Sequence, residues 1–369
     1  MEYRELGKTG MQVSVVGIGT LGFARAGLLK DDETSRQAIV EIVCRALERG
    51  VTFIDTALAY GGGRAEQGVG AGLKASAAKP VILTRTHSWQ KSTDPAVIAA
   101  DIDASRERLG VDVLDVYQLH DISSPKAYAK VRENDLYAPI VQAKKEGKVK
   151  AIGYSSHGDA GLVRQLVDEN EVDVVTLAYN ILHSKRSPGD GEDPKITATK
   201  LFPMLKERGI GITVMKPFGG GILTWNLKAG SRLPPAQLVR YVVENPHIAT
   251  VAPGVDSMAQ LEELVPAGNA DAALSQDDMR QLEEAANNWG ADLCRQCGYC
   301  QPCSREINIP RVMRLLMQWQ HTKDEKLREQ YAKLDVKADA CVACGDCEER
   351  CPYDLAIAEK MEETAAIFA

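Results

Sequence analysis

Short apolar runs alternate with stretches of helical periodicity from the N-terminus to residue 275. Between the first two runs, apolar residues recur three and four positions apart, which predicts the buried face of a helix. Thr34 or Ser35 can cap the start of this helix, and Gly50 ends it. The segments Leu136–Glu146 and Asp159–Asn170 repeat the pattern. The predicted strands are Val13–Gly17, Thr52–Asp55, Val81–Thr84, Val113–Gln118, Lys150–Ser155, Val174–Leu177, Gly211–Lys216 and Thr250–Pro253.

The order of these elements predicts the class of fold. Strands that alternate with helices indicate a parallel sheet, because each parallel connection needs a crossover. Eight such units within about 250 residues favour a closed (β/α)8 TIM barrel over an open doubly wound sheet. One more helix is expected over residues 276–293, with Leu282, Ala285, Ala286 and Trp289 on its apolar face. In such a barrel the reactive groups lie where strands end and loops begin.

Length and composition set the number of domains. The chain has 369 residues, of which 44% are apolar, and a single core rarely exceeds ~250–300 residues. We therefore expect a barrel over residues 1–290 and a small second domain over residues 291–369. The net charge is −7 and the basic residues are scattered, which argues against nucleic acid or anionic lipid as a partner. No stretch approaches the ~20 apolar residues of a membrane span, and the N-terminus has no apolar signal core.

Eight of the nine cysteines lie in the last fifth of the chain, in two runs. The runs are Cys294, Cys297, Cys300 and Cys303, then Cys341, Cys344, Cys347 and Cys351, followed by Pro352. Spacings of two residues let successive thiolates converge on one small inorganic cluster. Zinc ribbons and a disulfide framework are the rival interpretations, and three cysteines in tandem, twice, fit neither well. The ninth, Cys44, lies in a helical apolar stripe and is expected in the core.

The second run resembles the C-x2-C-x2-C-x3-C-P motif of bacterial ferredoxins, in which the fourth cysteine ligates the other [4Fe–4S] cluster. The resemblance implies a mainly helical ferredoxin-like domain that moves single electrons. It implies that Cys294, Cys297, Cys300 and Cys351 hold one cluster, and that Cys341, Cys344, Cys347 and Cys303 hold the other. The first run departs from the motif, because only two residues precede Cys303 and Ser304 replaces the usual proline. Reduced thiols that hold iron predict a cytoplasmic protein.

Polar residues lie at the ends of several predicted strands. The segment Phe53–Gly61, with Asp55 and Tyr60, resembles the signature around the catalytic aspartate and tyrosine of the aldo-keto reductase family, and Asp115–His120 resembles its catalytic-histidine strand. Further matches follow in family order, at Arg4–Gly10, Ala151–Ser156, Ala178–Asn180 and Met215–Pro217. The ferredoxin-like extension is similar to one found in a subgroup of that family.

The resemblance implies hydride transfer between NAD or NADP and a small carbonyl or alcohol. Tyr60 would be the acid. A free phenol has a pKa of ~10, so it is a poor proton donor and acceptor at neutral pH unless a nearby cation stabilises its phenolate. The family uses a lysine paired with the aspartate, but the matching residue here is Arg85. Arginine keeps the charge and can pair with Asp55, but it is bulkier and cannot release a proton. His120 would hydrogen-bond to the substrate oxygen.

The same resemblance implies a set of cofactor contacts. Tyr179 would stack on the nicotinamide, and Ser155, Ser156 and Asn180 would lie near its carboxamide. Lys216 and the turn Pro253–Gly254 would lie near the pyrophosphate and adenosine. Many relatives place a basic residue near here for the 2′-phosphate of NADP. Asp256 stands at that position, and because an anion repels a phosphate, NAD gains support over NADP.

Three interpretations of the whole chain remain open. In the favoured one, a nicotinamide-dependent oxidoreductase exchanges electrons through its clusters with a redox protein. In the second, Arg85 disables hydride transfer and leaves an electron carrier or docking scaffold. In the third, the clusters only stabilise an ordinary reductase. The charged stretch Lys323–Lys333 is interpreted as a solvated helix face, with redox-partner docking as the weaker alternative.

Overall fold

The chain forms two compact units in a computed structural model. One unit comprises Met1–Phe218 with Pro235–Met279, and the other comprises Gly219–Pro234 with Arg280–Ala369. The structure describes residues 1–157, 160–184, 200–224, 233–288, 293–294, 300–351 and 355–369.

Eight parallel strands form the sheet of the first unit, and each pairs with the next along the chain. They are β3 Ile18–Gly19, β4 Phe53–Asp55, β5 Val81–Thr86, β6 Leu114–Leu119, β7 Val149–Ser156, β8 Val174–Ala178, β9 Gly211–Met215 and β10 Thr250–Val251. Parallel bridges from Val16 to Val251 and from Gly19 to Gly254 join the first strand region to the last. The sheet therefore closes on itself, and the predicted (β/α)8 barrel is confirmed.

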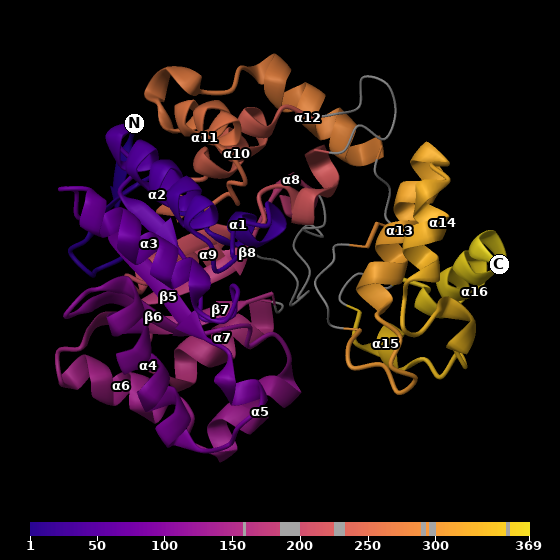
Figure 1. The fold of residues 1–369 in the computed structure, drawn as a ribbon, viewed down its shortest axis with the longest axis horizontal. Coiled ribbons are helices and arrows are strands. Elements are labelled where there is room, and N and C mark those ends of the chain that lie inside the picture. Colours follow the sequence, from indigo (N-terminus) through magenta and orange to yellow (C-terminus); the bar gives the residue numbers. More distant parts are fainter. Residues whose placement is uncertain (158–159, 185–199, 225–232, 289–292, 295–299, 352–354) are drawn as a thin grey trace. The chain divides into compact units, whose positions relative to one another are not determined.

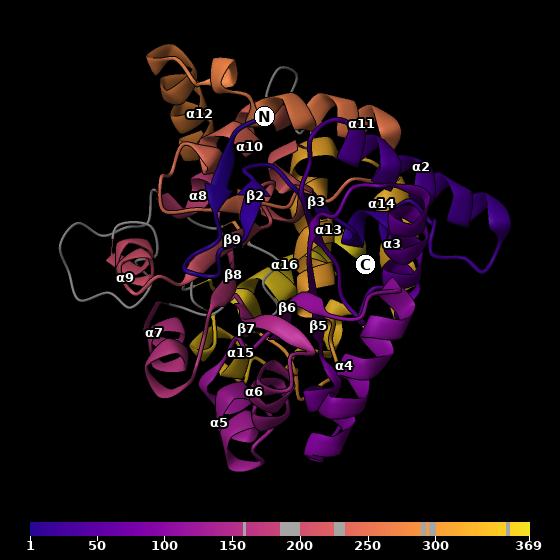
Figure 2. The ribbon, with the colours of Figure 1, turned by 90° about the vertical axis from the view of Figure 1, so that its left-hand side faces the viewer.

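Helices surround these strands (Figures 1 and 2). They are α1 Leu21–Arg25, α2 Glu33–Glu48, α3 Arg64–Ala75, α4 Pro95–Leu109, α5 Pro125–Glu133, α6 Ala138–Lys145, α7 Ala160–Glu169, α8 Ile181–Ser184, α9 Phe202–Glu207, α10 Pro235–Val243 and α11 Met258–Leu264. The cap predicted for α2 is wrong, because the Asp32 carboxylate, and not Thr34 or Ser35, accepts the hydrogen bond of the Ser35 N–H (2.7 Å). Cys44 lies at the edge of the core, half-buried.

The first predicted strand, Val13–Gly17, is also wrong. Residues Gln12–Ser14 form β2, which pairs antiparallel with β1 (Tyr3–Glu5), and the barrel strand begins only at Ile18. Ser14 marks the change of partner: its N–H donates to Thr52 Oγ1 and its hydroxyl donates to the Val16 carbonyl, both at 2.8 Å. One apolar run therefore serves two sheets, a hairpin at one end of the barrel and the barrel itself.

Apolar side chains fill the barrel at the hairpin end. They form one buried cluster of Leu6, Val13, Phe53, Leu83, Val116, Ala151, Val174, Ala249 and Ala252. Side chains two residues apart on a strand point to the same face. Asp55, Arg85 and Gln118 follow cluster members by two residues on β4, β5 and β6, so they too point into the barrel. The barrel interior thus changes from apolar to polar towards the carboxyl ends of its strands.

The second unit is mainly helical, as predicted. Its helices include part of α12 Gln276–Asn288, then α13 Ile309–Thr322, α14 Lys326–Ala332, α15 Asp346–Glu349 and α16 Ile357–Phe368. Of the residues predicted for the apolar face of α12, Leu282 is buried and Trp289 lies outside the described residues. In the part of the chain that the structure describes, no helix combines the length and the apolar character needed to cross a membrane.

Aromatic packing holds the C-terminal helices together. The ring of Phe368 stacks on Tyr331 (4.8 Å between centroids) and meets Trp319 at 5.3 Å. The Arg328 guanidinium lies 4.7 Å from the Trp319 ring and donates a hydrogen bond to the Ile367 carbonyl (2.6 Å). The charged stretch Lys323–Lys333, predicted to be a solvated helix face, contains α14. This helix exposes charged residues but buries Leu327 and Tyr331.

Candidate active site and cluster-binding pocket

An ion pair is buried where β4 and β5 end. Arg85 Nη2 donates to Asp55 Oδ2, and the two side chains are only 1% and 7% exposed. Burial raises the pKa of Asp55 above its ordinary value, and the charge of Arg85 opposes that rise. The attraction between two buried charges offsets the cost of removing them from water only when their remaining hydrogen-bond donors and acceptors also have partners. Among the described residues, Arg85 Nε has no hydrogen-bond partner, so one donor remains for another acceptor.

His120 follows the last residue of β6. Its N–H donates to the Thr86 carbonyl (2.8 Å), and its own carbonyl accepts from Trp89 Nε1 (2.7 Å). These bonds fix the backbone that carries the imidazole. Burial first, and then the charge of Arg85, hold the pKa of His120 well below its ordinary value. The imidazole is therefore neutral at neutral pH, and a neutral ring can both donate and accept a hydrogen bond.

Tyr60 lies in the turn that follows β4. Its ring meets His120 edge-on, with 5.9 Å between centroids and 85° between planes. The three glycines that follow, Gly61–Gly63, all have positive φ and lead into α3. The Leu58 N–H, in the same turn as Tyr60, donates to the Arg85 carbonyl (3.0 Å), and the His120 backbone is bonded to the next residue of β5. The structure thus brings all four predicted catalytic residues to the same end of the barrel.

The loop after β5 contributes two residues that the sequence analysis missed. His87 packs against His120 with 6.5 Å between ring centroids, and Trp89 holds the His120 backbone as described above. Burial lowers the pKa of His87 as well. Both His87 and His120 have a buried Nδ1 that bonds to none of the described residues. The sequence signal for His87 was its position directly after β5, the strand that carries Arg85.

The lowered pKa of His120 predicts how stability responds to acid. The unfolded histidine binds a proton below about pH 6.5, whereas the buried folded one does not, so the stability present above that pH is lost as pH falls. When the pH falls from about 7.5 to about 5.5, we expect the unfolding free energy of the wild type to drop by ~1.4 kcal/mol more than that of the His120→Gln variant. Urea unfolding at both pH values measures this difference. Equal losses in the two proteins would show that folded His120 takes up the proton freely.

Two serines at the end of β7 hold the loop that follows β6. Ser155 Oγ accepts from the Asp121 N–H (2.8 Å), and Ser156 Oγ donates to the Ile122 carbonyl (2.7 Å). Both serines are buried. Asn180, after β8, donates its amide to the Lys216 carbonyl (2.9 Å). These predicted cofactor residues thus connect the loops around the mouth of the barrel.

The remaining predicted cofactor residues lie at the ends of β8, β9 and β10. Tyr179 is only 4% exposed and packs against Phe202 (5.2 Å between centroids). Lys216 has a φ of 58°, a left-handed conformation that costs a non-glycine residue about 1–3 kcal/mol and is concentrated at functional sites. Pro253 accepts a hydrogen bond from the Gly19 N–H (2.8 Å), and Gly254 forms the closing bridge of the barrel.

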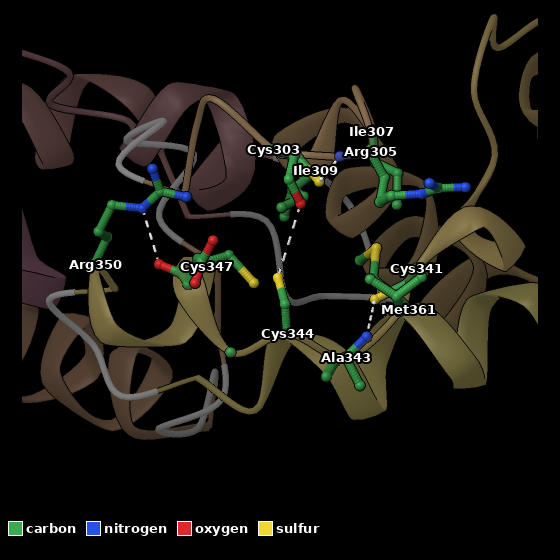
Figure 3. Close-up of a pocket in the computed structure, with 15 residues that line it drawn as sticks. Cys303, Arg305, Ile307, Ile309, Cys341, Ala343, Cys344, Cys347, Arg350 and Met361 are labelled. Atoms are coloured by element: carbon green, nitrogen blue, oxygen red, sulfur yellow. Dashed lines mark hydrogen bonds between the residues drawn. The ribbon is translucent and has the colours of Figure 1, made fainter.

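Four cysteines from both runs line one pocket in the helical unit (Figure 3). They are Cys303, Cys341, Cys344 and Cys347, which are the four that the ferredoxin motif groups together. Burial and the charge of Glu348 raise the pKa of the Cys347 thiol to about 11. A thiol in this setting becomes a thiolate when a cation offsets its charge, as bound iron does. The donor set and its enclosure in one pocket therefore fit an iron–sulfur cluster.

The second predicted group of cysteines is described in part. Cys294, Cys300 and Cys351 are each at most 8% exposed, and Cys297 lies outside the described residues. Arg350 Nη2 donates to the carbonyls of Cys300 (3.2 Å) and Pro302 (3.0 Å), which ties the second run to the first. Within the described ranges, no three His, Cys, Asp or Glu side chains are grouped so that they could hold a single metal ion.

Comparisons with known proteins agree with this arrangement. Residues 15–235 match the model of the Aldo/keto reductase family, and residues 293–356 match that of the 4Fe-4S dicluster domain. The chain is 28% identical over 236 residues to the NADH-specific methylglyoxal reductase of Escherichia coli, covering 59% of this chain and 68% of the relative. It is 28% identical over 297 residues to the L-galactose dehydrogenase of Arabidopsis thaliana, covering 72% and 88%.

A solved structure extends the likeness to the fold. The holo form of aldo-keto reductase AKR11C1 from Bacillus halodurans superposes with a TM-score of 0.59 at 23% identity. The match covers 77% of this chain and 96% of that one. At this identity the likeness shows the shared barrel alone.

Proposed function

Because this chain belongs to the aldo/keto reductase family and carries a 4Fe-4S dicluster domain, we propose that its barrel transfers hydride between a nicotinamide cofactor and a small carbonyl or alcohol. One observation carries the proposal. The buried pair of Asp55 and Arg85 lies in the same strand-end cluster as the ring pair of Tyr60 and His120, at the end of the barrel where such enzymes react.

Each of these residues has a distinct task in the proposed reaction. NAD or NADP, when bound, supplies a hydride to the carbonyl carbon or takes one from the alcohol. Tyr60 gives its hydroxyl proton to the carbonyl oxygen in one direction and takes it back in the other. Arg85 supplies the fixed positive charge that favours the phenolate, and Asp55 holds Arg85 in place. Neutral His120 orients the oxygen by a hydrogen bond.

The cofactor is proposed to lie across the carboxyl ends of β7 to β10. The contacting residues would be Ser155, Ser156, Tyr179, Asn180, Lys216, Pro253 and Gly254. Asp256 supports NAD over NADP, because its side chain would repel a 2′-phosphate. The Escherichia coli relative, whose name states NADH specificity, is consistent with that preference.

The helical unit is proposed to hold two [4Fe–4S] clusters and to pass single electrons to a redox protein. Cys303 is the proposed ligand whose spacing departs from the ferredoxin motif, so replacing it gives the sharpest test of the ligand set. Cys303→Ser is expected to lower iron and sulfide from about eight to about four per chain, because a cubane cluster that loses a thiolate is held poorly. Cys44→Ser is the matched control, since Cys44 lies in the barrel, on α2. Full iron in Cys303→Ser would remove Cys303 from the ligand set.

The whole proposal is tested by anaerobic titration of the purified protein with NADH and NADPH while nicotinamide and cluster absorbance are followed together. Bleaching of the clusters as nicotinamide is consumed would support an oxidoreductase whose barrel and clusters exchange electrons. Carbonyl turnover without bleaching would support clusters that only stabilise the protein. Failure of both cofactors to bind, with turnover gained in Arg85→Lys, would favour the scaffold or electron-carrier interpretation.

A further inference from the structure

Ser304 occupies a position that distinguishes the two cysteine runs. The second run ends in Cys351 and Pro352, whereas the first ends in Cys303 and Ser304. A proline has no hydroxyl and no N–H to donate. Ser304 and the next residue, Arg305, both line the pocket of Cys303, Cys341, Cys344 and Cys347. The departure from the motif therefore places a hydroxyl donor, that of Ser304, beside this group of thiolates.

The sulfurs of Cys303, Cys341 and Cys344 each have a hydrogen-bond partner from a neighbouring residue. The Arg305 N–H donates to Cys303 Sγ (3.4 Å) and the Ala343 N–H donates to Cys341 Sγ (3.5 Å). Ser304 Oγ lies 3.9 Å from Cys344 Sγ, and Figure 3 shows these contacts as dashed lines. A sulfur bound to iron has no proton, so the Ser304 hydroxyl must be the donor in the loaded protein. Hydrogen bonds to cluster sulfurs are among the factors that set the reduction potential.

Positive charge borders the same pocket. Arg305 and Arg350 line it together with Asp346, so two basic residues stand against one acidic residue there. Arg350 is held by bonds from Nε to the Asp346 carbonyl (2.8 Å) and from Nη2 to the two carbonyls of the first run described above. Reduction adds one negative charge to a cluster. Neighbouring cations and donated hydrogen bonds stabilise that charge, and they therefore favour the reduced state.

Exposure differs between the two groups of cysteines in the same direction. Cys344 is exposed, and Cys303 and Cys341 are half-buried. Cys347, the fourth member of this group, is buried, as are Cys294, Cys300 and Cys351, the three described members of the other group. Water stabilises the more highly charged reduced cluster better than an apolar surrounding does.

We propose that Ser304 and Arg305 raise the reduction potential of the cluster at Cys303, Cys341, Cys344 and Cys347 above that of the other cluster. The inference rests on the ligand groups in the proposed function. It deepens that function by giving the two clusters an order. The first electron to enter the helical unit then settles on this cluster, which has the exposed ligand Cys344, and leaves to a redox protein from there. Ser304 acts through Cys344 and is a positioning residue.

An EPR-monitored redox titration of the loaded, full-length protein tests this proposal, because the second cluster is an internal control. Cys344→Ser first identifies which signal belongs to which cluster. Ser304→Ala is then expected to change the ratio of reduced to oxidised cluster at a fixed potential about three- to tenfold, or ~30–60 mV downward for a one-electron couple. Arg305→Gln, which keeps the backbone donor and removes the charge, is expected to shift the same cluster in the same direction. Neither variant should move the other cluster.

Thr322→Ala is the matched surface control, because Thr322 is exposed on α13 and its hydroxyl makes only backbone contacts there, donating to the Gln318 carbonyl (2.8 Å) and accepting from the Asp324 N–H (3.3 Å) among the described residues. It should move neither potential. A Ser304→Ala protein whose two potentials are unchanged, or shift equally, overturns the tuning. Iron and sulfide analysis separates this result from a failure of the proposed function. A wild-type protein with fewer than two clusters overturns the ligand groups and the tuning with them, whereas two clusters with unmoved potentials overturn the tuning alone.

Discussion

Replacing Tyr60 with phenylalanine is expected to lower the rate of carbonyl reduction by about 10²–10⁴-fold, the usual contribution of a positioned acid. The variant keeps the ring that packs edge-on against His120 at 5.9 Å and loses only the hydroxyl. Nicotinamide binding should therefore be unchanged while kcat falls. Single-turnover reduction of a small aldehyde, with cofactor affinity measured in parallel, separates the two quantities.

Tyr3→Phe is the matched control for this change. Tyr3 is 50% exposed on β1, and its hydroxyl donates to the Gly50 carbonyl (3.0 Å). The control should turn over like the wild type. A Tyr60→Phe protein with full activity would show that another group gives the proton. The next candidates would be His120, whose ring meets that of Tyr60, and His87, whose ring packs against His120.

Replacing Asp55 with asparagine is expected to destabilise the barrel by about 3–5 kcal/mol, because it leaves the charge of Arg85 buried without its counter-ion. Arg85 is 1% exposed, so water cannot substitute for the lost carboxylate. The same change should remove turnover, since an unanchored guanidinium no longer holds its charge beside the reacting groups. Chemical unfolding of the variant and the wild type at neutral pH measures the first effect.

A substitution in a surface ion pair is the control for the stability loss expected of Asp55→Asn. The side chain of Asp103 is 47% exposed and pairs with Arg106 at 2.9 Å, and Asp103→Asn should cost at most about 1 kcal/mol. Replacing both members of the buried pair, as Asp55→Leu with Arg85→Met, should recover much of the stability without the activity. A loss for Asp55→Asn no larger than for Asp103→Asn would mean that Arg85 finds another partner in the folded protein.

The apolar periodicity of the sequence was sufficient to predict the barrel, because burial on both faces leaves continuous apolar runs that recur from strand to strand. It failed at Val13–Gly17, where one run pairs first with a hairpin and then with the barrel. Both arrangements bury the same side chains, so the pattern could not distinguish them. The cap of α2 failed for a similar reason, since Asp32, Thr34 and Ser35 are all acceptable caps and only backbone geometry selects one.

The candidate site was predictable where a strand end coincides with a match to the family motifs. Asp55, Arg85 and His120 lie at or directly after strand ends, and Tyr60 is carried by the turn after β4. His87 lies directly after β5 just as His120 lies directly after β6, but no family motif was matched at His87, so strand-end position alone did not single it out. The pocket around Cys303 joins segments on either side of α13 and α14, and only the motif, not the local pattern, predicted that they meet.

Closure of the barrel has a consequence during synthesis. One edge of β3 pairs with β4 early, but its other edge has no partner until β10 leaves the ribosome, because the closing bridges join Val16 to Val251 and Gly19 to Gly254. At about 5–20 residues per second the nascent chain presents that open strand edge for about 10–50 s. Unpaired edges recruit strands from other chains. A shortened transcript that stops before Thr250 would leave the edge open permanently, so its product is a target for chaperones and proteases and not a smaller barrel.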